Sequence, residues 1–191
     1  MDDKRVGGAC PAACRLDAPG VIRHRVAMPT LAQAAQDFLA QKRFAIVGVS
    51  RDSQQPANFN FRKLHDAGYE VFPVNPQATT IEGVPCFPNL KSIPGGVDAV
   101  LIYTPPQVTE SVVRECADLG IVRVWIHRSI GGGSYSEAAE RVARERGLAL
   151  IPGGCPAMFL SPDFGHKCMR WVLNAFGRLP KDVPVPGSSS R

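Results

Sequence analysis

The sequence predicts an α/β fold, namely a doubly wound, Rossmann-like, five-stranded parallel sheet in three α/β/α layers. The first observation is that short runs rich in β-branched residues, typical of strands buried on both faces, recur along the chain. The second is that amphipathic segments of about ten to fifteen residues separate these runs, with short connections between them. Such alternation indicates right-handed βαβ units, because neighbouring parallel strands need a crossover.

The first half of the chain divides into an extension and the start of this pattern. Residues 1–29 mix Gly, Ala, Pro and Arg without periodicity, so we expect a flexible extension. Thr30 can cap a helix that runs to Gln41. The elements expected next are a strand over 44–49, a helix over 58–67, a strand over 69–74 and a small extra strand beside the turn at Gly83.

The second half repeats the alternation. The expected strands cover residues 97–103, 122–126 and 148–151, and the expected helices cover 107–119, a segment from Ser134 or Ser136 to Arg146, and 164–176. Residues 179–191 are rich in Pro and Ser and predict a loose tail. The sequence therefore predicts one domain, residues 30–178, between two tails.

Composition excludes several classes of partner. The 191 residues carry a formal net charge of +5, but no run of five or six Lys or Arg that would form a nucleic-acid-binding arm. No stretch approaches the length of apolar sequence needed to cross a membrane, and the N-terminus lacks the apolar segment of a signal peptide. The six cysteines are scattered, which fits reduced thiols. We expect a cytoplasmic protein with neither a nucleic-acid nor a membrane partner.

A turn after the first strand predicts a phosphate site. Gly48, Ser50 and Ser53 lead into a helix, whose free N–H groups and dipole favour an anion, and Arg51 can pair with a phosphate. In doubly wound sheets, ligands bind outside the carboxyl ends of the strands. The turns at 75–76, 104–106 and 127–133 are therefore expected to gather around the same ligand.

The nucleotide preference follows from the second strand. A dinucleotide fingerprint has three glycines in the first turn and an acid after the second strand. Here Ser50 replaces the second glycine, and Asn75 and Pro76 stand where the acid would be. A ligand with a phosphorylated ribose, or an adenine resting on Asn75 and Pro76, fits better than NAD. NADP stays open, because an arginine can bind its 2′-phosphate.

Six motifs between residues 43 and 156 extend this argument: IVGVSRD, AGYEVFPVNP, IEGVPCFPNL, DAVLIYTPPQ, ADLGIVRVWIH and GLALIPGGCP. In them the chain resembles the small CoA-binding, Rossmann-like proteins related to the N-terminal domain of succinyl-CoA synthetase α subunits. The resemblance implies coenzyme A or an acyl-CoA as ligand. It implies that Gly48, Ser50 and Arg51 hold its phosphates. Asn75, Pro76 and residues 104–106 would flank the adenosine, with Val108 as an apolar neighbour.

The predicted binding residues are Gly48, Ser50, Arg51, Ser53, Asn75, Pro76, Thr104, Pro105, Pro106, Val108 and His127. The catalytic histidine of the synthetase lies in a second domain, so the resemblance implies ligand binding only. We therefore expect a stand-alone carrier, sensor or regulator, more a binding protein than an enzyme, with no catalytic residue and no metal site. A homodimer is one way to bury the helix that carries Trp171 and Phe176.

The competing hypothesis is an enzyme. An NADP-dependent oxidoreductase or an acyl-CoA-using transferase would use His127 or Cys155 as its reactive group. We favour a structural role for both, because no local motif pairs His127 with a nucleophile and because free cysteines are commonly buried and inert. His166 and Cys168 could join Cys155 around a metal, but a fourth ligand is not evident.

Overall fold

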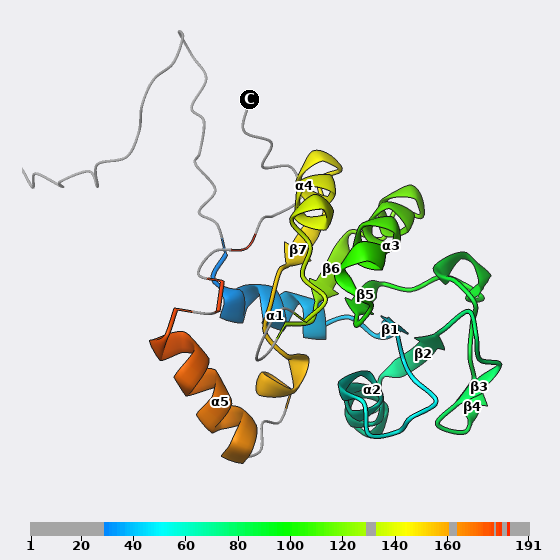
Figure 1. Cartoon of the computed structure of the whole chain (residues 1–191), viewed down its shortest axis with the longest axis horizontal. Helices are drawn as coiled ribbons and strands as arrows, with labels where there is room; N and C mark the ends of the chain where they lie inside the picture. The colour runs from blue at the N-terminus through cyan, green and yellow to red at the C-terminus, as the bar shows by residue number, and fades with distance from the viewer. Residues whose placement is uncertain (1–28, 129–132, 161–163, 178, 181–182, 184–191) are drawn as a thin grey trace, which may run out of the picture.

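The computed structural model describes residues 29–128, 133–160, 164–177, 179–180 and 183 (Figure 1). Nearly all of the predicted extension and most of the predicted tail lie outside the described residues. The helices are α1 (Leu31–Leu39), α2 (Pro56–Asp66), α3 (Pro106–Asp118), α4 (Glu137–Glu145) and α5 (Phe164–Ala175), with 3₁₀ helices η1 (Leu90–Ser92) and η2 (Pro156–Met158). The strands are β1 (Arg43–Val47), β2 (Glu70–Val74), β3 (Thr80–Ile81), β4 (Val84–Pro85), β5 (Ala99–Ile102), β6 (Arg123–Ile126) and β7 (Ala149–Ile151).

The main sheet has five strands in the order β2-β1-β5-β6-β7, and every pair is parallel. This confirms the predicted Rossmann-like fold. The chain goes from β1 to β2 on one side and later returns to place β5 on the other side of β1. The direction of winding therefore reverses between β1 and β5, and such a switch point opens a crevice at the carboxyl ends of the two strands.

Two apolar cores cover the two faces of the sheet. From β1, Phe44 and Ile46 point into the core with α1 and α2, whereas Ala45 and Val47 point into the core with α3 and α4. Figure 1 shows the two pairs of helices on opposite sides of the sheet. This alternation explains why the strands consist of continuous apolar residues, since each side chain meets a helical layer whichever way it points.

The ends of the elements differ slightly from the predictions, for local reasons. Thr30 and Gln33 form a capping box on α1, as the predicted cap at Thr30 requires. The strand β1 ends at Val47 rather than Val49, because Gly48 adopts a φ of +94° that leaves the extended region. Helix α2 begins at Pro56, two residues early, since proline suits the first helical turn. The extra strand near Gly83 is one arm of the β3–β4 hairpin.

Helix α5 packs away from the sheet. It contacts η2, and Leu173 joins Cys155 and Met158 in a small separate cluster. The sequence predicted this helix but not η2, which turns the chain beneath it. Among the described helices, none combines the length and the apolar character that crossing a membrane requires.

Candidate ligand-binding site

A pocket of about 430 Å³ lies at the carboxyl ends of β1, β5 and β6. The loops after these three strands and the start of α2 supply its walls. The lining residues are Gly48, Ser50, Gln55, Pro56, Ala57, Tyr103, Thr104, Pro105, His127, Gly133 and Ser134. The pocket therefore occupies the switch point between β1 and β5, where a ligand is expected in a doubly wound sheet.

Gly48 brings the loop after β1 close to the loop after β5. A Cβ atom at position 48 would lie 2.7 Å from the carbonyl carbon of Tyr103 and 2.9 Å from the nitrogen of Thr104. The N–H group of Gly48 also donates to the carbonyl of Val74, 3.1 Å away. Both the positive φ and the close approach of the two backbones require glycine here.

Asn58 holds the next part of this loop. Its Oδ1 accepts from the N–H of Ser50 at 2.9 Å, and its Nδ2 donates to the Ser50 carbonyl at 2.8 Å. The same Nδ2 donates to Oε1 of Glu82 at 2.9 Å, and Arg62 donates to that oxygen at 2.7 Å. Asn58 is only 1% exposed. The β3–β4 turn, which carries Glu82, thus fixes the pocket loop through a buried amide.

The helices α2 and α3 begin at the pocket without side-chain caps. Within the described residues, Gln55 before α2 and Pro105 before α3 make no capping hydrogen bond, although both line the pocket. By contrast, Thr30 caps α1 and Ser136 caps α4. Uncapped first turns leave N–H groups and the positive end of the helix dipole for a ligand. The pocket therefore suits an anion such as a phosphate.

Buried hydrogen bonds of Thr104, Thr109 and Ser134 support the part of the pocket formed by the loops after β5 and β6. Thr109 Oγ1 donates to the carbonyl of Ser134 at 2.8 Å, and the Oγ1 atoms of Thr104 and Thr109 are 3.0 Å apart. Because Thr109 has a single hydroxyl hydrogen, Thr104 is the donor in the second hydrogen bond. The N–H group of Ser134 donates to the carbonyl of His127 at 2.9 Å. These bonds hold the loop after β6 against the start of α3.

Two aromatic side chains give the pocket a neutral surface. The rings of Tyr103 and His127 stack with centroids 4.5 Å apart. Burial lowers the pKa of His127 to about 4, so the imidazole is neutral at pH 7. Burial also raises the pKa of Tyr103, whose hydroxyl is buried and finds no hydrogen-bond partner among the described residues. The ring of Tyr103, rather than its hydroxyl, therefore forms the pocket surface.

We expect the buried, neutral His127 to make the protein less stable in acid. A histidine with a lowered pKa binds its proton in the unfolded chain first, so stability is lost as the pH falls from 6.5 through the folded pKa of about 4. The loss attributable to His127 should be about 3 kcal/mol at pH 4 and below. Urea unfolding of the wild type and of His127→Gln between pH 7 and 4 measures it as the difference between two curves. Parallel curves would show that burial does not suppress protonation of His127.

Cys155 lies outside the pocket lining and is buried beside Asn60 of α2. The sulfur is 3.6 Å from Nδ2 and 3.7 Å from Oδ1 of Asn60. Burial raises the pKa of the thiol, which keeps it protonated and weakly nucleophilic at pH 7. A base with a pKa of about 4, such as His127, is also poorly matched to neutral pH. In this environment, burial disfavours a reactive role for both groups.

Five of the predicted binding residues line the pocket: Gly48, Ser50, Thr104, Pro105 and His127. The other predicted residues are not in its lining. Arg51, Ser53, Pro76 and Val108 are exposed, and Pro106 starts α3. The Asn75 side chain is engaged in the fold, because it donates to the Val49 carbonyl at 2.7 Å and accepts from the Gln77 N–H at 2.8 Å.

Five lining residues were not predicted from the sequence: Gln55, Pro56, Ala57, Tyr103 and Ser134. Gly133 was not among the predicted binding residues, but it lies in the turn 127–133 that was expected beside the ligand. Of the five, Pro56 had a recognisable signal, because proline suits the first turn of a helix that faces the pocket. Tyr103 gave none, because an aromatic residue at a strand end is common in any sheet. In the described part of the chain, no three His, Cys, Asp or Glu residues gather as metal ligands would.

Comparisons with known proteins find relatives across most of the sheet. The family described as CoA binding domain matches residues 42–161. "Uncharacterized protein YneT" of Bacillus subtilis (strain 168) is 28% identical over 127 residues, 66% of this chain and 91% of that protein. The ADP-forming acetate–CoA ligase II of Archaeoglobus fulgidus is 28% identical over 124 residues, 61% of this chain but only 18% of the ligase. A hypothetical protein from Pyrococcus horikoshii OT3 superposes with a TM-score of 0.62 at 27% identity, covering 68% of this chain and 92% of that one.

Proposed function

Since the chain belongs to the CoA binding domain family, we propose that it binds coenzyme A or an acyl-CoA as a stand-alone cytoplasmic module, acting as a carrier, sensor or regulator without chemistry of its own. The observation that carries this proposal is the switch-point pocket, into which the uncapped starts of α2 and α3 open. The match to the acetate–CoA ligase supports the ligand but covers too little of that enzyme to support its reaction.

The diphosphate of CoA would lie against the loop from Gly48 to Ala57. Gly48 lets the loop approach a ligand closely, and the first turn of α2 offers N–H groups at Ala57 and Asn58. Arg51 and Ser53, exposed on this loop, would contact phosphates from the solvent side. The pantetheine arm would pass Tyr103 and His127, whose neutral rings suit an uncharged chain.

The adenosine would lie outside the pocket, near Pro76, Pro106 and Val108. Val108 is 44% exposed on the first turn of α3, so an adenine ring would cover apolar surface there. Asn75 would act by shaping its turn, because its amide is already hydrogen-bonded to the Val49 carbonyl and the Gln77 N–H group. The absence of an acid at this turn supports CoA over NAD, because NAD-binding domains bind the ribose diol with a carboxylate.

Calorimetric titration with CoA, 3′-dephospho-CoA, NAD and NADP tests the proposal. We expect CoA to bind most tightly. Loss of the 3′-phosphate, or the change Arg51→Ala, should weaken binding by about 1.5–3 kcal/mol, the scale of a hydrogen bond to a charged group. Arg144→Ala is the matched control, because it removes the same charge from the exposed face of α4.

The possible outcomes distinguish an error in the proposed ligand from an error in the role of Arg51. A clear preference for NADP, or no binding of CoA, would refute the proposed function and revive the oxidoreductase hypothesis. If CoA binds equally well to wild type and Arg51→Ala, then Arg51 does not contact the ligand, but CoA is still the ligand of the protein. Equal weakening in Arg51→Ala and Arg144→Ala would assign the effect to net charge rather than to contact with a phosphate.

A further inference from the structure

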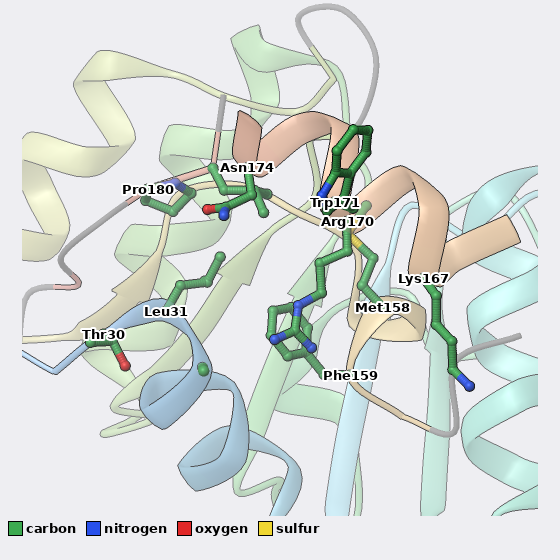
Figure 2. A pocket seen from close by; sticks show the side chains of 11 residues that line it. Thr30, Leu31, Met158, Phe159, Lys167, Arg170, Trp171, Asn174 and Pro180 are labelled. Atoms are coloured by element: carbon green, nitrogen blue, oxygen red, sulfur yellow. The ribbon is translucent and has the colours of Figure 1, made fainter. Parts of the chain in front are cut away.

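A second cavity, of about 540 Å³, lies between the start of α1, η2 and α5 (Figure 2). It shares no lining residue with the switch-point pocket. Most of its lining comes from residues 30–32 and 167–180, outside the segment that matches the CoA binding domain family. Its volume falls in the range of roughly 300–1,000 Å³ typical of small-molecule sites. The CoA proposal gives this cavity no role.

The cavity combines apolar walls with cationic side chains. Leu31, Met158 and Phe159 provide apolar surface, and Lys167 and Arg170 come from α5. The Arg170 guanidinium lies over the Phe159 ring, 4.8 Å from its centroid, and Figure 2 shows the two side chains together inside the cavity. Stacking fixes the guanidinium but leaves its N–H edge for a second partner.

No acid neutralises these two cations in the described structure. Among the lining residues there is no Asp or Glu. None of the ion pairs between described residues involves Lys167 or Arg170. A cavity lined by cationic side chains, with no anionic side chain among its lining residues, complements an anion.

Trp171 indicates that the occupant of this cavity also has an apolar part. It lines the cavity and is 70% exposed, although tryptophan is usually largely buried. In Figure 2 its indole stands beside Arg170, with Leu31 of α1 facing α5 across the cavity. An occupant with an apolar body would cover the indole and Leu31 while its charged end met Arg170.

We propose that this cavity binds an amphipathic organic anion, namely a carboxylate carried on a hydrocarbon chain. Arg170 pairs with the carboxylate in its planar, two-pronged geometry, and Lys167 adds a second positive charge at the edge. The hydrocarbon chain of the ligand lies along Leu31, Met158 and Trp171. A neutral hydrocarbon would leave both cations without a partner, and a cationic amphiphile would be repelled. This site is independent of the CoA site.

Tryptophan fluorescence tests the proposal with dodecanoate, below its micelle concentration, as the probe. The chain has two tryptophans. Trp125 is fully buried, with its indole N–H bonded to the Gly153 carbonyl, so the ligand-dependent signal comes from Trp171. We expect a saturable blue shift that disappears in Trp171→Phe, while calorimetry still detects dodecanoate binding to that variant. Dodecanol and dodecyltrimethylammonium should bind at least tenfold more weakly.

The change Arg170→Gln should weaken dodecanoate binding about tenfold or more, on the scale of one charge-assisted hydrogen bond. Arg144→Gln on α4 makes the same change at a distance and should leave binding unaltered. Both variants should bind CoA like the wild type, so a failure here is distinguishable from a failure of the proposed function. Urea unfolding confirms that the variants are folded.

Three results would overturn the proposal. The first is the absence of a saturable change with dodecanoate. The second is equal affinity of wild type and Arg170→Gln, or of dodecanoate and dodecanol, since the site would then be only an apolar surface. The third comes from sedimentation: a wild-type dimer that dissociates in Trp171→Ala, with no dodecanoate binding to either, would assign this face to a second copy of the chain.

Discussion

Gly48→Ala is expected to lower the free energy of unfolding by about 4 kcal/mol and to abolish CoA binding. Two costs combine: an L residue at a φ of +94° carries backbone strain, and its Cβ would stand 2.7 Å from the Tyr103 carbonyl carbon. That neighbour is backbone of the loop after β5, so no side-chain rotation relieves the clash. The strands β1 and β5 must separate at the pocket, which moves the loop after β1 away from the start of α2.

Gly120→Ala is the matched control for Gly48. Gly120, after α3, has a φ of +72°, but a Cβ there would meet nothing within 4 Å. It should therefore lose only the conformational part, about 1–2 kcal/mol, and retain CoA binding. Urea unfolding and calorimetry on both variants measure the difference. Equal losses in the two proteins would mean that the approach of the backbones at Gly48 is not the reason for the glycine.

Asn58→Asp is expected to cost about 4 kcal/mol at neutral pH and to weaken CoA binding strongly. The replacement loses the Nδ2 group that donates to the Ser50 carbonyl and to Glu82. It also places a second carboxylate about where a 2.9 Å hydrogen bond joined Asn58 to Glu82, in a position 1% exposed. Both the unsatisfied carbonyl and the like charges destabilise the fold.

The pH dependence and a second substitution distinguish these two causes. Paired carboxylates have a raised pKa in the folded state, so the folded variant binds more protons and the deficit relative to wild type shrinks as the pH falls. Adding Glu82→Gln should restore a donor between positions 58 and 82 and recover part of the stability at pH 7. If the deficit of Asn58→Asp does not change between pH 7 and 4, charge repulsion with Glu82 is not its cause.

Local signals made the fold predictable from the sequence. The strands of the main sheet are short, mostly apolar runs because both faces of the sheet are covered, and several helices begin at a recognisable residue such as Thr30 or Pro106. Gly48 was also recognisable, since a glycine after a first parallel strand marks a tight turn. These features depend on a few neighbouring residues, which a linear sequence displays directly.

The clamp at Asn58 could not be predicted in this way. Asn58 and Glu82 are 24 positions apart and meet only because the β3–β4 turn folds over α2. The hydrogen bond from the Asn75 amide to the Val49 carbonyl was not predictable either, because it depends on how β1 and β2 align; the predicted contact of Asn75 with a ligand stays a prediction. The cavity beside Trp171 likewise depends on η2, which has no distinctive pattern. Such contacts follow from tertiary geometry rather than from spacing.

The two hydrogen bonds from Asn58 to the Ser50 backbone have a consequence for the kinetics of recognition. A glycine-containing loop normally loses conformational entropy when it closes on a ligand, and that loss weakens binding. Here folding has already fixed the loop, through the buried Asn58 amide and the adjoining Arg62–Glu82 ion pair. The loop is therefore preorganised. If the proposed nucleotide binds here, we expect its association to be limited by encounter rather than by rearrangement of this loop.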